Sequence, residues 1–493
     1  MPEPLSKQLR RFTRAECILL ILIPALYALL INHFRTFNID NPWYAAYTYS
    51  WWNSHSPTDP FMQRSFPDGM GGVEAFGKLA AAIQGGVMNA IGWRVTHFEF
   101  LSLIFVSAAL FVFADTARRM GRSRNFVIVY VTVIGLSEQF FFAAEQARYE
   151  YVTLLLFSLA LWVGTRRWFV FSAFLAALCM EVQPAGCLPF MATVVFLLCL
   201  EGDAKEKRGR ILRIAAGTLL AAPVYLALHP YIFATARRVL HSSGHAVKGV
   251  PGGFLVGYFL ESKRHLAELP FFFAAAVLAL RNRRAILREW AAIAIGIAIL
   301  MSILMRWDNP RYVALLMPFV AWFLVDAFAE RNWKWIVAGT ALVFLPQYTY
   351  RAYVSLRHPD FTSAEQDQVS AALGRAAARM GKHSEDLRVR GNDWLWFAHP
   401  QNFVALDMRT LLPGSPHSAD VVLCFDTPLD PVLGVRSSEV ACNELQHLPP
   451  AAETVYLHGV PLHVVDTAGI DLQGDRLAVL KRFGRHSFAK AHH

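Results

Sequence analysis

Charged residues are scarce in this 493-residue chain, at 17% of the sequence, while 55% of the residues are hydrophobic. Soluble domains average roughly 25% charged residues, so this composition excludes an ordinary soluble protein and favours one that crosses a membrane many times. The net charge of +10 does not indicate a nucleic-acid partner. The lysines and arginines gather in short clusters between apolar segments, and they form no continuous basic face and no nucleic-acid-binding motif.

Cysteine is also rare, with six residues, and the chain lacks repeats and low-complexity tracts. Cys424 and Cys442 lie in the polar C-terminal part, where they can pair if that part faces an oxidising compartment. The other four lie in apolar segments, where a free thiol packs as a small hydrophobic side chain: Cys17, Cys179, Cys187 and Cys199.

Apolar segments of membrane-spanning length dominate the first 350 residues. A spanning helix needs about 20 mostly apolar residues. About eleven segments approach that length: 16–33, 98–117, 125–142, 150–165, 168–182, 187–201, 211–230, 268–281, 290–306, 311–329 and 334–350. No small-x-small cleavage site follows the first of them, so we interpret it as a retained signal anchor. The stretch from Phe76 to Ile91 is too short to span and is predicted to be an interfacial helix.

Clusters of arginine and lysine mark one side of the membrane. By the positive-inside rule this side is cytoplasmic. An odd number of spans then places the N-terminus in the cytoplasm and the C-terminal part outside. The clusters occupy the N-terminus and alternate connections: Arg118/Arg119/Arg122/Arg124, Arg166/Arg167, Lys205/Lys207/Arg208/Arg210, Arg281/Arg283/Arg284/Arg288 and Arg331/Lys334.

The character of the sequence changes after Arg351. A capping-box pattern over 362–365 predicts the start of a helix, and short β-like runs such as 421–425, 455–465 and 477–480 follow it. We therefore predict a polytopic α-helical transmembrane module over 1–350 and a small extracytoplasmic α/β domain over 351–493. No catalytic motif stands out in the second part.

The first outward loop, 34–97, and the start of the fourth span carry candidate acids. Asp40 follows the first span directly, and a carboxylate there can take a proton from an attacking hydroxyl. The plainer interpretation is a solvated acid at a helix end. Arg148-Tyr149-Glu150 begins the fourth span on the same side, where ionisable residues serve either as anchors or as functional groups. Glu150 is thus a second candidate acid, and Arg148 a candidate phosphate contact.

Several cationic residues are predicted to lie on the outward side of the membrane. Lys78 stands alone in an apolar stretch, and it is either a point charge for a phosphate or a snorkelling anchor. The turn from Arg306 to Tyr312 holds Arg311 as well as an acid, so it is either an internal ion pair or a clamp for phosphate or sugar. His241 and His245 have helical spacing but no third ligand, so zinc is not predicted.

Aromatic residues cluster just after Asp40. Interfacial aromatic belts explain most such clusters, and one or two members can also stack on a sugar. The cluster consists of Trp43, Tyr44, Tyr47, Tyr49, Trp51 and Trp52.

Taken in order, these stretches resemble the bacterial lipid-phosphate-sugar-dependent glycosyltransferases of the GT-C type. The resemblance is to the protein-mannosyltransferase-like group (glycosyltransferase family 39), which includes the aminoarabinose transferase of lipid A. The chain departs from that pattern in Asn41, which replaces a usual second acid, and in Gln183, which stands where histidine is frequent. The resemblance covers about residues 15–350 and is carried by 39–46, 56–60, 77–93, 148–150 and 311–318.

The resemblance implies an inverting transfer of a sugar from a polyprenyl-phosphate donor to a hydroxyl of an envelope lipid, glycan or protein. The reaction would take place at the periplasmic face of the bacterial inner membrane. Asp40 would be the base, and Glu150 would help to place the acceptor. No metal or other cofactor is expected, although a divalent cation stays open. Four cations would bind the donor phosphate, namely Lys78, Arg148, Arg306 and Arg311, and four aromatic residues would contact sugar or acceptor, namely Trp43, Tyr44, Tyr149 and Tyr312.

Two other classes of protein stay open. A transporter or flippase for lipid-linked saccharides predicts ionisable residues deep within the spans and symmetry between the two halves. The predicted spans hold few charged residues and no repeat, which favours chemistry at the membrane surface. A non-catalytic envelope assembly protein is the other alternative.

Overall fold

The structure is a computed structural model whose chain divides into two compact units. Unit 1 comprises Met1–His33, Phe76–Ala80 and Glu99–Ala352, and unit 2 comprises Phe34–Ala75, Ala81–Phe98 and Tyr353–His493. The structure describes residues 12–34, 40–54, 77–230, 277, 289–305, 312–357, 363–405, 419–426, 441–446, 448–467 and 473–474.

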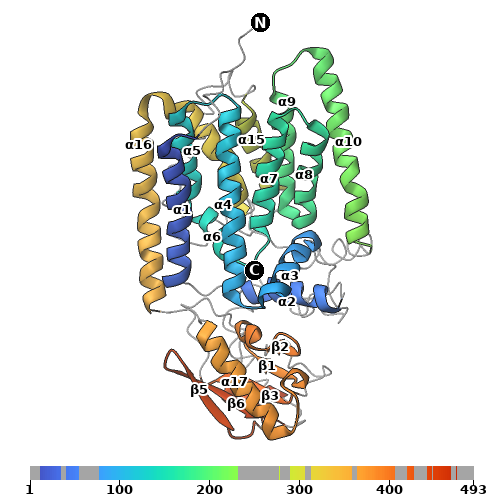
Figure 1. Cartoon of the computed structure of the whole chain (residues 1–493), viewed down its shortest axis with the longest axis vertical. Helices are drawn as coiled ribbons and strands as arrows, with labels where there is room; N and C mark the ends of the chain where they lie inside the picture. The colour runs from blue at the N-terminus through green and yellow to red at the C-terminus, as the bar shows by residue number, and fades with distance from the viewer. Residues whose placement is uncertain are drawn as a thin grey trace, which may run out of the picture. The chain divides into compact units, whose positions relative to one another are not determined.

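Unit 1 is a bundle of apolar helices (Figure 1). Its helices follow the predicted spans closely, and the predicted segment 268–281 lies almost wholly outside the described residues. The bounds are α1 Arg14–His33, α4 Val95–Arg119, α5 Arg124–Leu136, α6 Glu138–Glu145, α7 Glu150–Thr165, α8 Phe169–Val182, α9 Cys187–Cys199, α10 Ala204–Leu228, α15 Trp290–Met305 and α16 Val313–Arg357, with the 3-10 turn η3 at Pro184–Gly186.

Within the described ranges, three helices are long and apolar enough to cross a membrane, namely α1, α4 and α10. The number becomes four if the bent pair α5 and α6 forms one span. Helices α7, α8 and α9 and the apolar parts of α15 and α16 are shorter. The total of about eleven spans therefore stays a prediction, while the apolar bundle itself is confirmed.

The segment predicted as one span over 125–142 is broken at Ser137, where α5 and α6 meet at an angle of 61°. The Ser137 hydroxyl donates to the Ile134 carbonyl at 2.8 Å and accepts from the Phe140 backbone N–H at 3.3 Å. A serine offers the backbone these local hydrogen bonds in place of helical ones, which is why an apolar pattern alone misses the break.

Helix α16 spans 45 residues, yet residues of its two halves contact opposite ends of α5. Trp322 packs on Phe126 near the start of α5, with ring centroids 5.0 Å apart, whereas the Tyr348 hydroxyl donates to the Leu136 carbonyl at its end, at 3.0 Å. Asp326 also pairs with Arg122, just before α5. A straight helix would carry Tyr348 roughly 33 Å further from Asp326, beyond the start of α5. The chain therefore bends back between Asp326 and Tyr348.

Helices α8 and α10 lie side by side because a glycine permits it (Figure 1). A Cβ on Gly217 would come within 2.1 Å of the Val170 carbonyl oxygen and 2.9 Å of the Ala173 side chain. The two helices run in the same direction, with α9 between them in the chain. Val170, near the start of α8, meets Gly217 in the middle of α10, and further along both helices Ala177 and Leu178 pack with Ala221.

Unit 2 contains α2 (Asp40–Ser54), most of α3 (Lys78–Ile91), α17 (Ser363–Met380) and a sheet. Helix α17 packs against β5, β6 and the 3-10 turn η7 (Asp393–Ala398) and so covers one face of that sheet (Figure 1). The five strands have the order β2 (Phe403–Ala405), β1 (Val389–Gly391), β3 (Val421–Phe425), β6 (Val460–Asp466) and β5 (Glu453–Leu457).

The pairing in this sheet is mixed: β1 is parallel to β2 and β3, whereas β6 is antiparallel to β3 and β5. The β5–β6 hairpin turns at His458 and Gly459, both with positive φ, as a tight two-residue turn requires. The predicted α/β character of the C-terminal part is confirmed, while the predicted strand at 477–480 lies outside the described residues. A second pair, β4 (Leu445–Gln446) with β7 (Gln473–Gly474), is antiparallel.

Ion pairs and a disulfide fix the C-terminal part of unit 2. Arg379 of α17 pairs with Asp466 of β6 at 2.8 Å, and Arg375 pairs with Glu453 of β5. Cys424 in the buried strand β3 is bonded to Cys442, the pairing that the sequence left open. A link between residues 18 apart stabilises a fold by about 3 kcal/mol, mainly by restricting the unfolded chain.

Candidate functional site

The entry to α3 in unit 1 is fixed by a glycine. Gly77 has φ +88°, and its backbone N–H donates to the Glu181 carbonyl at 2.7 Å. A Cβ at this position would come within 2.4 Å of the Tyr149 ring and 2.7 Å of the Val182 carbonyl oxygen. Because both the conformation and the space favour glycine, this position sets where the next residue, Lys78, begins the helix.

Lys78 is the first residue of α3 and is only 3% exposed. The next backbone N–H, that of Leu79, donates to both carboxylate oxygens of Glu181, at 3.2 and 3.3 Å. A carboxylate satisfies the otherwise unpaired N–H groups of a first helical turn and complements its dipole. The end of α8 therefore holds α3 at the point where its lysine is buried.

Glu181 also contacts a histidine. His229, at the end of α10, places Nε2 2.9 Å from the Glu181 carboxylate, and both side chains are buried. The Tyr225 ring stacks on the imidazole at 4.8 Å. Among the described residues, His229 Nδ1 has no hydrogen-bond partner. A buried carboxylate thus connects the ends of α8 and α10 to the start of α3.

Arg148 and Glu150, predicted as a phosphate contact and an acid, form a buried ion pair. Arg148 Nε lies 2.9 and 3.1 Å from the two Glu150 oxygens, and a terminal nitrogen lies 2.7 Å from one of them. Tyr149 stands between them in the chain, and its ring lies against Gly77. The structure therefore brings the start of α7 next to the entry to α3.

The remaining predicted residues fall elsewhere. In unit 2, Asp40 is the first residue of α2, and its side chain is outside the description. Trp43 donates its indole N–H to Asp393 at 2.7 Å, and Tyr44 is half-buried. In unit 1, Tyr312 precedes α16 and is also half-buried. Arg306 and Arg311 lie outside the described residues, as do His241 and His245.

The sequence did not single out Glu181 and His229. Both lie near the ends of predicted spans, at 168–182 and 211–230, and an ionisable residue inside a span was the signal that could have found them. Glu138 and Glu181 are both buried, so the predicted spans hold buried ionisable residues near their ends that we did not expect. In the parts of the chain that the structure describes, no group of three or more His, Cys, Asp or Glu side chains is placed to hold a metal ion.

No family profile matches the chain, and no curated protein sequence is similar to it. Among solved structures, the chain is similar to ArnT from Cupriavidus metallidurans bound to undecaprenyl phosphate, with a TM-score of 0.54 and 12% identity over 91% of this chain and 97% of that chain. It is also similar to the Archaeoglobus fulgidus oligosaccharyltransferase in the apo form, with a TM-score of 0.47 and 11% identity over 83% and 69% of the two chains.

The likeness to ArnT extends over nearly the full length of both chains and identifies the fold. Together with the apolar helices of unit 1, it defines a membrane protein with a GT-C-type glycosyltransferase fold.

Proposed function

We propose that this protein transfers a sugar from a polyprenyl-phosphate donor to a hydroxyl acceptor. The observation that carries the proposal is Lys78, a cation buried at the start of α3 and held there by Glu181 and Gly77, in a chain with the GT-C fold. The solved relative ArnT was bound to undecaprenyl phosphate, which supports a lipid phosphate as part of the donor.

The chemistry explains why a fixed lysine is useful. As the acceptor oxygen bonds to the anomeric carbon, the bond from that carbon to the phosphate oxygen breaks, and negative charge develops on the departing lipid phosphate. A cation already in place stabilises that charge without reorganising during the reaction. Lys78 supplies the cation, and Arg306 and Arg311 are proposed to bind the same phosphate. No metal is needed in this scheme.

The acceptor must lose a proton as it attacks. We assign this proton to Asp40 at the start of α2, because a carboxylate within hydrogen-bond reach of the hydroxyl can act as the base. Arg148 and Glu150 act as one ion-paired unit, which orients Tyr149 and so helps to place the acceptor. Trp43, Tyr44 and Tyr312 complete the proposed contacts with the sugar and acceptor, through ring faces and hydroxyls.

The proposed location is the bacterial inner membrane, with unit 2 in the periplasm. The clusters of arginine and lysine in the N-terminal part support a cytoplasmic N-terminus. The Cys424–Cys442 disulfide supports an oxidising compartment for the C-terminal part.

The test is donor turnover by the purified full-length protein. Polyprenyl-phosphate sugars are supplied with membrane extract as acceptor, and free polyprenyl phosphate is measured. We expect Asp40→Ala and Lys78→Ala each to lower turnover at least about 100-fold. The matched control, Lys205→Ala, removes a lysine from the first turn of α10 and should leave turnover unchanged.

Two outcomes would decide against this function. Full activity of Asp40→Ala would remove the proposed base, and turnover from none of the donors would remove the transferase itself. Movement of a labelled donor across a proteoliposome membrane, without release of polyprenyl phosphate, would instead establish the transporter alternative.

A further inference from the structure

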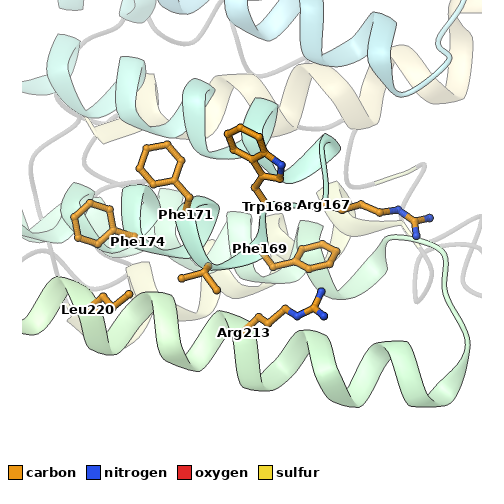
Figure 2. Close-up of a pocket in the computed structure, with 8 residues that line it drawn as sticks. Arg167, Trp168, Phe169, Phe171, Phe174, Arg213 and Leu220 are labelled. Carbon is orange, nitrogen blue, oxygen red and sulfur yellow. The ribbon is translucent and has the colours of Figure 1, made fainter.

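A cleft of about 500 Å³ lies between α8 and α10 in unit 1, at the end of these helices where cations gather (Figure 2). It is separate from the Lys78 site, because it lies at the start of α8 while Glu181 lies at its end. The arginine end of the cleft, at Arg167, lies 14 positions before Glu181 in the chain, roughly 20 Å away along the helix direction. The lining residues are Arg167, Trp168, Phe169, Val170, Phe171, Phe174, Arg213 and Leu220.

The lining is amphipathic along its length. On α8 positions 170, 171 and 174 follow helical spacing, and on α10 positions 213 and 220 do the same. Arg167 lies in the turn just before α8. Because the two helices run in the same direction, Arg167 and Arg213 lie toward the same end, and apolar side chains line the rest. Phe171 and Leu220 are 47% and 56% exposed, so the apolar part faces the bilayer rather than the bundle core.

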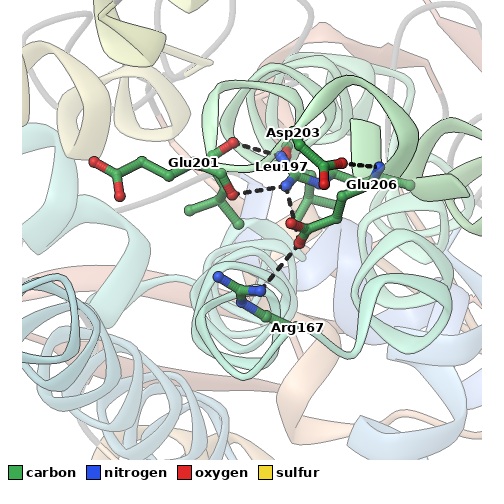
Figure 3. Close-up of polar contacts among 7 residues, drawn as sticks. Arg167, Leu197, Glu201, Asp203 and Glu206 are labelled. Atoms are coloured by element: carbon green, nitrogen blue, oxygen red, sulfur yellow. Dashed lines mark hydrogen bonds and ion pairs between the residues drawn. The ribbon is translucent and has the colours of Figure 1, made fainter. Parts of the chain in front are cut away.

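A neighbouring network determines which of the arginines are available. Arg210 is buried and donates to the Leu197 and Leu200 carbonyls at 2.8 and 2.6 Å, which closes the end of α9. Glu206 lies between Arg210, at 3.5 Å, and Arg167, at 3.0 Å (Figure 3). The Glu206 carboxylate is thus shared by the guanidinium groups of Arg167 and Arg210. These three side chains together carry a net positive charge.

Arg167 and Arg213 provide the accessible positive charge. The Arg167 side chain is 66% exposed despite its pair with Glu206. Arg213 is exposed, and within the described ranges it forms no ion pair with an acid. Two arginines with an apolar slot below them match a molecule that carries one anionic group and a hydrocarbon chain.

We propose that this cleft binds an anionic phospholipid from the leaflet on the cation-rich side of the protein. Guanidinium groups bind phosphate oxygens through paired hydrogen bonds, so Arg167 and Arg213 hold the headgroup phosphate. The rings of Phe171 and Phe174 and the Leu220 side chain pack along one acyl chain. A free phosphate would leave that apolar wall uncovered, and a zwitterionic lipid would lack the net negative charge that the arginines favour.

The test is lipid binding to the purified full-length protein, measured by native mass spectrometry. Phosphatidylglycerol and phosphatidylcholine with identical acyl chains are titrated in parallel, together with glycerol phosphate. We expect phosphatidylglycerol to bind in preference to both. An arginine near an anionic membrane surface contributes an attraction that corresponds to about a fivefold change in affinity. Arg213→Gln should therefore weaken phosphatidylglycerol binding about fivefold.

Two further variants test the charge and the shape of the cleft separately. Arg167→Gln together with Arg213→Gln should weaken binding about 25-fold, whereas Leu220→Trp should weaken phosphatidylglycerol binding by filling the slot while leaving the charge unchanged. The matched control is Arg124→Gln, which removes an exposed arginine at the start of α5, outside the cleft lining, and should bind like the wild type.

The proposal is overturned if phosphatidylcholine binds as tightly as phosphatidylglycerol, or if the arginine variants bind like Arg124→Gln. If glycerol phosphate binds as tightly as phosphatidylglycerol, the cleft binds a free anion rather than a lipid, and this result would also overturn the proposal. Exposed arginines can be replaced without loss of folding, and donor turnover in the same variants reports any damage to the Lys78 site.

Discussion

At the scale of the residue, one carboxylate organises the candidate site of unit 1. Glu181 accepts from Leu79 through its side chain and from Gly77 through its carbonyl, and it pairs with His229. A buried donor or acceptor that loses its partner costs about 1–3 kcal/mol, so these groups depend on one another. Gly77 depends on the same arrangement, because it fits between the end of α8 and the Tyr149 ring.

The Gly77→Ala substitution tests this arrangement. An added Cβ would meet Tyr149 at 2.4 Å in a backbone conformation that favours glycine, so α3 must shift and carry Lys78 with it. We expect donor turnover to fall at least about tenfold, because misplacement by about 1 Å can cost up to 100-fold. The measurement is turnover alongside thermal unfolding.

Gly209→Ala is the matched control for Gly77→Ala. It adds the same methyl group to helix α10, where a Cβ has open space, and should leave turnover unchanged and raise stability by about 0.5–1 kcal/mol. Wild-type turnover by Gly77→Ala would show that the close approach does not position Lys78.

At the scale of the element, a buried histidine is hydrogen-bonded beside strand β1 of unit 2. His399 follows the turn η7, and its Nε2–H donates to the Leu387 carbonyl at 2.8 Å, next to β1. Burial lowers the pKa of His399, and the hydrogen bond to Leu387 offsets part of that effect.

In contrast, the pKa of Glu453 is lowered chiefly by the hydrogen bond from Arg375, so this carboxylate stays ionised near neutral pH.

The lowered pKa of His399 predicts how the stability of β1 changes with pH. Below the usual histidine pKa of about 6.5 the unfolded chain binds a proton that the folded chain resists, so stability falls as the pH drops through this range. We expect hydrogen-exchange protection of β1, corrected for intrinsic rates, to decrease between about pH 7.5 and 5.5.

His399→Gln is the comparison for this pH effect. Glutamine can still donate to the Leu387 carbonyl but does not titrate, so the loss of β1 protection should become smaller. An equal loss in His399→Gln and wild type would assign the pH effect to other groups.

At the scale of the whole molecule, two features of the chain support the proposed sidedness in the membrane. The cation clusters and the disulfide are independent observations. The positive-inside rule relates the clusters to the cytoplasmic side, and the disulfide relates the C-terminal part to an oxidising compartment. Together they support the proposed cytoplasmic N-terminus and the proposed periplasmic location of the C-terminal part of unit 2.

Cysteine labelling in intact spheroplasts tests the sidedness. A cysteine introduced at Tyr456, which is 66% exposed on β5, should react with a membrane-impermeant maleimide. A cysteine introduced at Arg124 should react only after the membrane is permeabilised, which makes it the matched control. Labelling of Arg124→Cys and protection of Tyr456→Cys in intact cells would invert the topology.

The sequence by itself determined the apolar helices of unit 1 and the α/β character of the C-terminal part, because hydrophobic period and turn residues are local properties of the chain. It also identified Lys78, Arg148 and Glu150 as ionisable groups next to apolar segments. These groups are conspicuous because charge beside apolar sequence is costly.

Only the tertiary structure decided which of these groups meet. The Arg148–Glu150 pair, the contact of Glu181 with α3 and His229, and the approach of Gly77 to Tyr149 join residues whose separation in the chain ranges from two to more than a hundred. The break at Ser137 and the return of α16 along α5 were likewise settled by hydrogen bonds and packing. Apolar patterning sets which segments are buried, whereas partners far along the chain set where each buried polar group finds its hydrogen bond.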